Sequence, residues 1–437
     1  MEFMYKITGG TPVNGEIECM GAKNLVTKAM VASILAKSKT TLLNVPNIGD
    51  VDITIEMMES IGVTIQFNRE KGELVIDPST IDKNWINMPH SGSNRIPILL
   101  LGPLLHRFKE ARVPVMGGCN IGARRVDFHL DAIEKFGGTV NTTEEGYSAH
   151  CNQLTGCHVE LPYPSVGATE SCLFLSVLAK GDTVITNAAQ EPEIQELITL
   201  LRALGAIIYT YPDRKIVIEG VNELQGTTMK MLTDRIEGAS WACLACATNG
   251  DIVVKGLQAH TLGNFLPNFQ KIGGGFELLG SDSIRFYRKS ELKPIMLQTD
   301  VFPGFSTDWQ QPFVVLLTQA NGTSVVHETV YEKRFDYTKA LNLMGANTQL
   351  TTYCLGSACR FENKNHFHSA IINGATPLRG GTEIVVPDLR AGLAYVIAAA
   401  IANGETTIKS INYIERGYGN IAERGKKLSL QIKRVNE

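Results

Sequence analysis

Asp182-Thr183-Val184-Ile185 is a short β-branched segment that follows a glycine, and it begins one copy of a pattern that recurs along the chain. A loop and an amphipathic helix follow, and the helix ends at Leu204-Gly205. Lys215-Ile216-Val217-Ile218-Glu219 then alternates with period two, as strands do. Glycine just past the last helical turn is a common stop because it adopts the left-handed conformation. The stretch therefore predicts a strand–helix–strand unit.

Five further segments begin in the same way, at intervals of roughly 70 residues with a longer last interval. They are Lys39–Leu43, Ala111–Val115, Asp251–Val254, Thr323–Val326 and Glu405–Ile408. Four more of the helices that follow end in an apolar residue and glycine, at Ile61-Gly62, Phe136-Gly137, Ile272-Gly273 and Met344-Gly345. The sixth copy departs, because it runs through Lys426–Leu430 without the glycine.

A second type of helix, apolar on nearly every face, lies between successive copies. Cys172–Leu178 and Ala394–Ile401 are examples. A helix that is hydrophobic all round belongs inside a structure. With 437 residues the chain is also too long for one ordinary core. We therefore expect an α/β protein with two similar lobes of three units each, with the apolar helices inside.

The overall composition excludes several classes of partner. The net charge is −3 and basic residues are scattered, so a nucleic-acid partner is not expected. The longest apolar run, Ile96–Leu105, contains Gly102-Pro103 and is about half a membrane span. The N-terminus has no signal-peptide core, and nine cysteines without disulfide-framework spacing indicate a reducing compartment. These features predict a cytoplasmic protein with no membrane partner.

Two groups of residues resemble metal or redox motifs. Cys243 and Cys246 form a CxxC, but the surrounding helix is apolar, which favours a buried core pair. His366 and His368 are spaced like ligands, yet no cysteine or carboxylate cluster accompanies them in the sequence. We interpret them as loop residues, and we expect neither a metal nor a cofactor.

A glycine-rich loop carries a potentially reactive thiol. Gly117-Gly118-Cys119-Asn120-Ile121-Gly122-Ala123-Arg124-Arg125 holds one cysteine beside two arginines. A free thiol has a pKa of about 8.5, and neighbouring guanidinium charge favours the thiolate. The residues alone fit equally well a small apolar cysteine in a turn.

Cations precede several of the apolar helices. Lys23, Arg95, Arg235 and Arg390 lie where each helix begins, although a cation at a helix N-terminus is unfavourable unless an anion neutralises it. Simple N-capping explains Ser165, Thr307 and Asp388. The cations instead indicate that the helix starts bind an anionic substrate.

The ordered motifs resemble those of the UDP-N-acetylglucosamine enolpyruvyl transferase family, UDP-N-acetylglucosamine 1-carboxyvinyltransferases of the EPSP synthase superfamily. The similarity runs from about Gly9 to Arg424. The matching motifs are Lys23-Asn24, Gly117–Arg124, Val126–His129, Ser165–Thr169, Asn187–Ala189 with Glu191–Glu193, Asp234–Glu237, Thr307-Asp308, Asp388–Arg390 and Arg416–Tyr418.

The resemblance implies an inside-out α/β barrel of two domains, each with three βαβαββ-type repeats. One domain would comprise residues 1–22 and 234–437 and the other residues 23–233, which carry the Cys119 loop, with the active site in the inter-domain cleft. The implied reaction transfers the enolpyruvyl group of phosphoenolpyruvate to the 3-hydroxyl of UDP-N-acetylglucosamine and releases phosphate. It is the committed step of peptidoglycan synthesis and the target of fosfomycin. Both substrates are small molecules, and we expect a monomer or weak homo-oligomer.

The implied roles follow the motifs residue by residue. Cys119 would be the general acid and Asp308 the base for the acceptor hydroxyl, with Lys23, Arg124 and Arg416 completing the catalytic group. Phosphoenolpyruvate would be bound by Lys23, Asn24, Arg124 and Arg416. The UDP-sugar would be bound by Arg95, Arg124, Arg125, Val126, Asp127, Phe128, Ser165, Val166, Gly167, Asp308 and Val330. Asp234, Arg235, Arg334, Asp388 and Arg390 would lie elsewhere in the cleft.

Four departures from the family pattern border the implied acceptor pocket. Arg125 and Ser306 stand where the family usually has proline. Gly238-Ala239 replaces the usual pattern after Asp234–Glu237, and Val386-Pro387 precedes Asp388 where alanine-threonine is common. None removes a catalytic residue type. The four departures are also compatible with an enolpyruvyl transferase paralogue whose acceptor is another uridine nucleotide. A silent ligand-binding relative is disfavoured because Cys119, Lys23 and Asp308 are all present.

Overall fold

The computed structural model describes residues 3–86, 94–117, 126–386 and 391–436. The chain divides into two compact units. Unit 1 contains both chain ends, Met1–Met20 and Thr233–Glu437, and unit 2 contains Gly21–Gly118 and Arg124–Leu232. Within the described ranges, every helix is too short or too polar to span a bilayer.

The described strands of unit 2 form three sheets. The first has the order β13 (Thr228–Lys230), β3 (Thr40–Leu43), β5 (Glu73–Asp77), β4 (Thr64–Asn68). The second has the order β6 (Glu110–Pro114), β8 (Gly146–His150), β7 (Thr139–Thr142). The third has the order β11 (Ile207–Thr210), β12 (Ile216–Glu219), β10 (Asp182–Thr186), β9 (His158–Glu160).

The described strands of unit 1 form three more sheets. Their orders are β15 (Gly274–Leu278), β16 (Ser283–Arg288), β14 (Asp251–Lys255), β2 (Asn14–Glu18); then β17 (Met296–Gln298), β18 (Gly322–His327), β20 (Ser369–Gly374), β19 (Asn347–Thr351); and β21 (Glu383–Val385), β22 (Glu405–Lys409), β1 (Phe3–Thr8), β23 (Gln431–Asn436). Strands β1 and β2 belong to sheets built mainly from the C-terminal half, so both chain ends are needed to complete unit 1.

Every four-stranded sheet combines one parallel pair with two antiparallel pairs. In the third sheet of unit 2, for example, β10 pairs in parallel with β9 and antiparallel with β12, which pairs antiparallel with β11. The six strands expected from the recurring pattern are β3, β6, β10, β14, β18 and β22, and all six are confirmed. The five glycine helix stops are also confirmed, because Gly62, Gly137, Gly205, Gly273 and Gly345 all have positive φ, between 89° and 111°.

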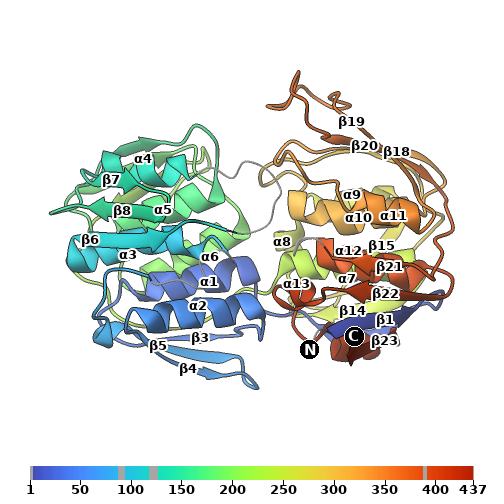
Figure 1. The fold of residues 1–437 in the computed structure, drawn as a ribbon, viewed down its shortest axis with the longest axis horizontal. Coiled ribbons are helices and arrows are strands. Elements are labelled where there is room, and N and C mark those ends of the chain that lie inside the picture. The colour runs from blue at the N-terminus through green and yellow to red at the C-terminus, as the bar shows by residue number, and fades with distance from the viewer. Residues whose placement is uncertain (1–2, 87–93, 118–125, 387–390, 437) are drawn as a thin grey trace. The chain divides into compact units, whose positions relative to one another are not determined.

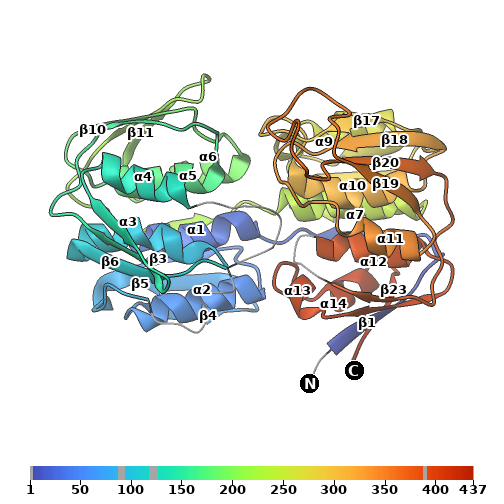
Figure 2. The ribbon, with the colours of Figure 1, turned by 45° about the horizontal axis from the view of Figure 1, so that its top comes forward.

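Each unit encloses apolar helices within its sheets (Figures 1 and 2). The inner helices of unit 2 are α1 (Lys23–Ser33), α3 (Ile96–Phe108) and α5 (Val166–Ser176), and those of unit 1 are α7 (Arg235–Ala247), α10 (Gln310–Leu317) and α12 (Gly392–Ile401). In unit 1, α7, α10 and α12 contact one another pairwise. Cys243 and Cys246 lie fully buried on α7, which confirms a core pair, and burial raises the pKa of Cys246 to about 12.

The remaining helices are shorter or more exposed. They are α2 (Gly49–Ser60), α4 (Asp127–Lys135), α6 (Pro192–Ala203), α8 (Ala259–Leu262), α9 (Phe265–Lys271), α11 (Thr338–Leu343), α13 (Asn412–Glu415), α14 (Ile421–Lys426), and the 3₁₀ turns η1 (Pro78–Thr80) and η2 (Thr307–Trp309). Helix α14 ends without the glycine stop, and Ser429 takes the positive φ instead, at 61°.

Candidate active site

The first cation of the sequence pattern is neutralised within unit 2. Lys23 begins α1, which has no acidic residue in its first turn and no side-chain cap. The Lys23 Nζ lies 2.9 Å from Asp50 Oδ2, and both side chains are largely buried. Asp50 is in the first turn of α2. A carboxylate from a neighbouring helix therefore offsets the unfavourable cation at this helix start, and Asn24 follows Lys23 in the same turn of α1.

The starts of α4 and α5 are fastened to each other. Helices α4 and α5 pack together, and His129 Nδ1 lies 2.7 Å from Ser171 Oγ. A Cβ on Gly167 would lie 3.0 Å from His129 Cε1, so a side chain there would press on the ring. Gly167, in the first turn of α5, therefore permits the close approach of His129 in the first turn of α4.

Capping side chains complete the helix starts of unit 2. Ser165 Oγ accepts a hydrogen bond from the Ala168 amide at 3.3 Å, and Asn94 Oδ1 accepts one from the Ile96 amide at 3.0 Å. Asn94 thus stabilises the start of α3, and Arg95 is the residue immediately before this helix. Ser165 is an N-cap, as the residue type alone indicated, and it remains next to the residues expected to bind nucleotide.

Glu170 is a buried carboxyl on α5 that the sequence analysis did not identify. Burial, with smaller contributions from Glu191 and Glu193 and against the opposing charge of Lys28, raises its pKa from 4.5 to about 7. Glu191-Pro192-Glu193 is one of the family motifs, and its two carboxylates lie close enough to Glu170 to affect its titration. The start of α5 therefore has a carboxyl that titrates near neutral pH.

Asp308 lies at the centre of a hydrogen-bonded network in unit 1. Its Oδ1 forms an ion pair with Arg334, whose side chain is 1% exposed. Arg334 Nε also donates to Thr307 Oγ1 at 3.2 Å, and Thr307 Oγ1 donates to Glu328 Oε2 at 2.9 Å. Ser306, one of the departures from the family pattern, caps η2 by accepting the Asp308 amide at 3.3 Å. Arg334 thus orients the carboxylate of Asp308, and Ser306 holds its backbone.

Glu328 connects this network to Val330. Its Oε1 accepts the backbone amides of Val330 at 2.8 Å and Tyr331 at 3.1 Å. Burial raises the pKa of Glu328, while Arg334 and the two amides act in the opposite direction. Glu328 was missed in the sequence analysis because it belongs to no motif, and its only signal is a charged residue directly after strand β18.

Arg235 lies against aromatic rings. Its guanidinium carbon is 5.1 Å from the centroid of Trp309 and 5.9 Å from that of Phe302. The Trp309 Nε1 donates to the Arg235 carbonyl at 3.4 Å, so the starts of α7 and α10 adjoin. Asp234 caps α7 by accepting the amides of Ile236 and Glu237 at 2.8 and 3.2 Å. A buried cation at this helix start is accommodated by cation–π contacts.

Arg416 lies at the end of α13, close to the start of α12. The preceding residue, Glu415, accepts hydrogen bonds from Tyr5 Oη at 2.9 Å and Arg434 Nε at 2.7 Å. Gly392, the first residue of α12, faces Ile414 so closely that its Cβ would lie 3.1 Å from a side-chain carbon. Helix α13, which Arg416 caps at its C-terminal end, therefore packs against the start of α12. Cys119, Arg124, Arg125, Asp388 and Arg390 lie outside the described residues.

The expectation that no cysteine cluster accompanies His366 and His368 is wrong for His368. His368 is accompanied by cysteine, because Cys354 Sγ lies 3.3 Å from its Nε2 and Cys359 Sγ lies 3.6 Å from Cys354 Sγ. His327 completes the group, whereas His366 is not part of it. Cys354 and Cys359 already lie close to His368 along the chain and were overlooked, whereas His327 comes from strand β18.

The chain is similar to known proteins over nearly its whole length. The EPSP synthase (3-phosphoshikimate 1-carboxyvinyltransferase) family model matches residues 7–424. A UDP-N-acetylglucosamine 1-carboxyvinyltransferase of Protochlamydia amoebophila (strain UWE25) is 48% identical over 439 residues, covering 98% of this chain and 94% of the relative. The protein of that name from Zymomonas mobilis subsp. mobilis (strain ATCC 31821 / ZM4 / CP4) is 36% identical, covering 98% and 99%.

Solved structures confirm the α/β fold class. The enolpyruvyl transferase NikO from Streptomyces tendae superimposes with a TM-score of 0.88 at 22% identity, covering 100% of this chain and 99% of that one. EPSP synthase from Acinetobacter baumannii gives 0.75 at 19% identity, covering 100% of both chains. The resemblance found in the motifs is confirmed: the chain belongs to the EPSP synthase (3-phosphoshikimate 1-carboxyvinyltransferase) family, and within it to the UDP-N-acetylglucosamine 1-carboxyvinyltransferases.

Proposed function

We propose that this protein transfers the enolpyruvyl group of phosphoenolpyruvate to the 3-hydroxyl of UDP-N-acetylglucosamine and releases phosphate, the committed step of peptidoglycan synthesis. The observation that carries the proposal is the 48% identity to a relative of that name over nearly the full length. The network that orients Asp308 supports it, because an acceptor hydroxyl must lose a proton to a positioned base.

The reaction balances with two protein groups that exchange protons. The Cys119 thiol gives a proton to the methylene carbon of phosphoenolpyruvate, and the sugar oxygen bonds to the adjacent carbon as its proton passes to Asp308. Collapse of this tetrahedral adduct expels phosphate, which takes up the proton held by Asp308, while a proton from the methyl carbon returns to the Cys119 thiolate and restores the double bond in the product ether. Cys119 and Asp308 thus serve as general acid and general base.

Cations bind the phosphate and carboxylate of phosphoenolpyruvate. Lys23 and Asn24 lie at the N-terminus of α1, where backbone amides and the helix dipole favour anions. We propose that phosphate competes with Asp50 for Lys23, so that the ion pair holds the ammonium in place before substrate binds. Arg124 and Arg416 supply the remaining positive charge.

The nucleotide sugar is bound by the starts of α3, α4 and α5. Arg95, Arg124 and Arg125, with Val126–Phe128 and Ser165–Gly167, contact the uridine diphosphate end, and Val330 contacts the sugar. The close packing of Gly167 on His129 supports this assignment, because it places two helix N-termini side by side. Asp234, Arg235, Arg334, Asp388 and Arg390 provide the surrounding charge. We propose a cytoplasmic monomer or weak homo-oligomer built from the domains 1–22 with 234–437 and 23–233.

Phosphate release from phosphoenolpyruvate tests the proposal. UDP-N-acetylglucosamine, UMP and shikimate 3-phosphate are offered as acceptors in separate reactions. We expect release with UDP-N-acetylglucosamine alone, and loss of that release in Asp308→Asn. Release with UMP alone would move the protein to another uridine nucleotide acceptor, and no release with any acceptor would contradict enolpyruvyl transfer.

Glu160→Gln is the control for Asp308→Asn, because Glu160 is an exposed carboxylate on β9. It should release phosphate at the native rate.

A further inference from the structure

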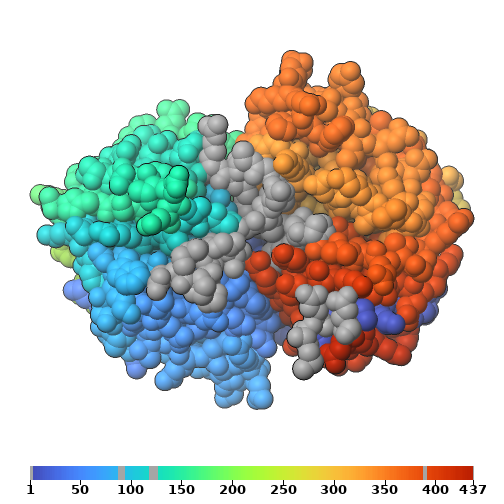
Figure 3. Space-filling view, viewed as in Figure 1, coloured from blue at the N-terminus to red at the C-terminus, as the bar shows by residue number. Residues whose placement is uncertain are grey.

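A long loop between β19 and β20 protrudes from the rest of unit 1 (orange, at the top of Figures 1 and 3). Residues 352–368 contain turns and bends but neither helix nor strand. Loops of this length without secondary structure are uncommon in compact domains, unless something fastens them or they serve a function. We therefore asked which contacts hold residues 352–368 in place.

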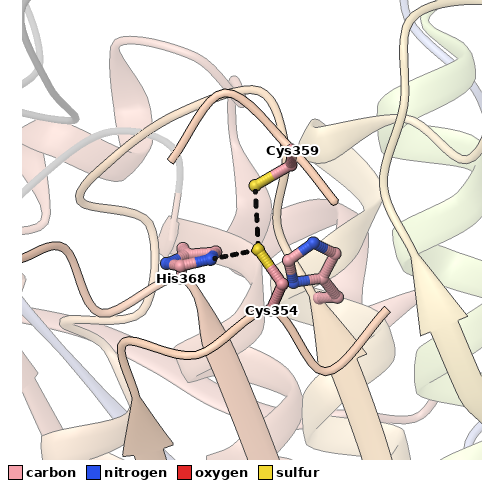
Figure 4. Close-up of side chains that lie close together, drawn as sticks. Cys354, Cys359 and His368 are labelled. Atoms are coloured by element: carbon pink, nitrogen blue, oxygen red, sulfur yellow. Dashed lines mark hydrogen bonds between the residues drawn. The ribbon is translucent and has the colours of Figure 1, made fainter. Parts of the chain in front are cut away.

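Four potential metal ligands meet at the base of this loop. His327, Cys354, Cys359 and His368 each offer one ligand atom, and these atoms all lie within 4.8 Å of one another. Figure 4 shows the Cys354 sulfur pointing toward both Cys359 and His368. His327 and His368 are buried, and the two cysteines are partly buried. The ligands come from strand β18, the loop, and the residue just before β20.

Hydrogen bonding leaves the Nε2 lone pair of His368 directed at the cluster. Its Nδ1 lies 2.7 Å from the carbonyl oxygen of His366, which can only accept a hydrogen bond. The Nδ1 therefore carries the proton, and the neutral ring has a lone pair on Nε2, 3.3 Å from Cys354 Sγ. A carbonyl that holds the second ring nitrogen is typical of histidine that binds a metal.

The same reasoning fixes the tautomer of His327. Ser369 Oγ donates its hydrogen to the Tyr353 carbonyl at 2.7 Å, so it must accept from His327 Nδ1 at 2.8 Å. The lone pair of His327 is then on Nε2. That atom is buried and has no hydrogen-bond partner of acceptable geometry among the described residues, although the Ser357 backbone lies close enough to affect the ring's pKa. A bound cation would satisfy it.

The spacing and chemistry of the four atoms fit zinc. Ligands at about 2.3 Å for sulfur and about 2.0 Å for nitrogen give tetrahedral edges of about 3.8 Å between sulfurs and about 3.5 Å between sulfur and nitrogen. The observed separations are 3.6 Å and 3.3 Å. Two thiolates and two neutral imidazoles would balance a divalent charge, as a buried site requires. Tetrahedral S₂N₂ coordination selects Zn²⁺ among the common divalent ions.

We propose that His327, Cys354, Cys359 and His368 bind one Zn²⁺ as a closed structural site that fastens loop 352–368 to strands β18 and β20. Four protein ligands leave no open coordination position, so the ion would not activate water or substrate. The ion itself would take no part in the proposed transferase chemistry.

The loop also contacts the segment next to Asp308. The Arg360 guanidinium donates a hydrogen bond to the Val330 carbonyl, and Glu328 directly follows His327. The Glu328 amide donates to the His368 carbonyl at 2.7 Å. Removing the ion would therefore loosen the loop first and disturb the backbone around Val330 second.

Metal content of the purified full-length chain tests the proposal. The protein is prepared without a polyhistidine tag or chelator, and zinc is measured by mass spectrometry. We expect one zinc per chain in the native protein and almost none in Cys354→Ser/Cys359→Ser. His366→Asn and Cys157→Ser are matched controls, because these residues lie outside the cluster, and both should retain the zinc.

Cobalt substitution provides a readout that does not depend on a folded variant. Native protein loaded with Co²⁺ should show absorption bands of tetrahedral thiolate coordination, and Cys354 and Cys359 should resist alkylation until a chelator is added. Absence of stoichiometric zinc and of the cobalt bands would overturn the proposal. A Cys354–Cys359 disulfide in the freshly purified protein, or full zinc retention by the double variant, would also overturn it.

Limited trypsin digestion tests the fastening role. Arg360 and Lys364 are exposed in the loop and are trypsin sites. We expect chelation to accelerate cleavage there by about tenfold or more, because the loop would lose its anchor. Cleavage in Cys354→Ser/Cys359→Ser should already be fast and should not respond to chelator. A native protein that loses its zinc with no change in cleavage would refute the fastening role.

Discussion

Replacing Glu170 with glutamine should make unit 2 more stable at pH 8 and change it little at pH 4. Glu170 is 2% exposed on α5, and burial raises its pKa from 4.5 to about 7. The folded chain therefore keeps this proton between these pH values, while the unfolded chain loses it. A folded-state pKa above the unfolded value gives stability that is present at low pH and lost as pH rises toward 7.

The magnitude follows from the pKa shift. A shift from 4.5 to about 7 corresponds to about 3 kcal/mol at about 1.4 kcal/mol per pKa unit. Most of this loss occurs between pH 5 and pH 8, so the stability difference between Glu170→Gln and the native chain should grow by about 2.5 kcal/mol over that interval. Glutamine has nearly the same shape and no titration, so it isolates the charge.

Hydrogen exchange of peptides from α5 is the appropriate assay, because a chain with two units need not unfold in one transition. Native and variant proteins are compared at the same pH, which cancels the intrinsic pH dependence of exchange. The ratio of their exchange rates should change about 50-fold or more between pH 5 and pH 8. Glu160→Gln is the matched control, because Glu160 is exposed on β9, and it should show no such change. A Glu170→Gln difference that is equal at both pH values would refute the reasoning.

Three further substitutions test the helix starts and the network. Arg334→Leu should destabilise unit 1 by about 3–5 kcal/mol, seen as a lower melting temperature, because Asp308 and Glu328 lose their buried cation; an unchanged melting temperature would contradict this. Gly167→Ala should weaken UDP-N-acetylglucosamine binding in calorimetry while leaving the fold intact, because the added Cβ would press on His129. Unchanged affinity would show that the close packing at Gly167 does not matter for binding. Burial lowers the pKa of His106 to about 4, so it gives stability that is lost as pH falls below about 6.5. His106→Gln should therefore reduce the loss between pH 7 and pH 5 by about 2 kcal/mol in urea denaturation monitored by circular dichroism, and equal losses in both proteins would count against it.

Residue patterns were sufficient to predict most local elements. The six recurring strands and the five glycine stops were confirmed because they depend on short-range chemistry: β-branched residues favour extended backbone, and glycine alone enters the left-handed region cheaply. The all-apolar helices were likewise confirmed as interior, since the residues of α7 are buried on every face.

Partners that neutralise the site cations could not be predicted. Asp50 for Lys23, Trp309 for Arg235 and Glu328 beside Arg334 all come from other elements. Sequence analysis identified the cations as unusual because a cation at a helix start is unfavourable. It could not identify their partners, because ion pairs and ring contacts depend on how the helices pack.

The sequence by itself determined the α/β class, the repeated units and the residue types of the proposed reaction, because these follow from periodicity and from motifs that are continuous in the chain. Only the tertiary structure brought His327 on β18 next to Cys354, Cys359 and His368. Strand β18 pairs with β20 so that His327 lies opposite Ser369, and this register places the histidine at the base of a distant loop. Cys354, Cys359 and His368 lie close together along the chain, but the fourth ligand depends on strand register, which is set by side chains packing on both faces of the sheet.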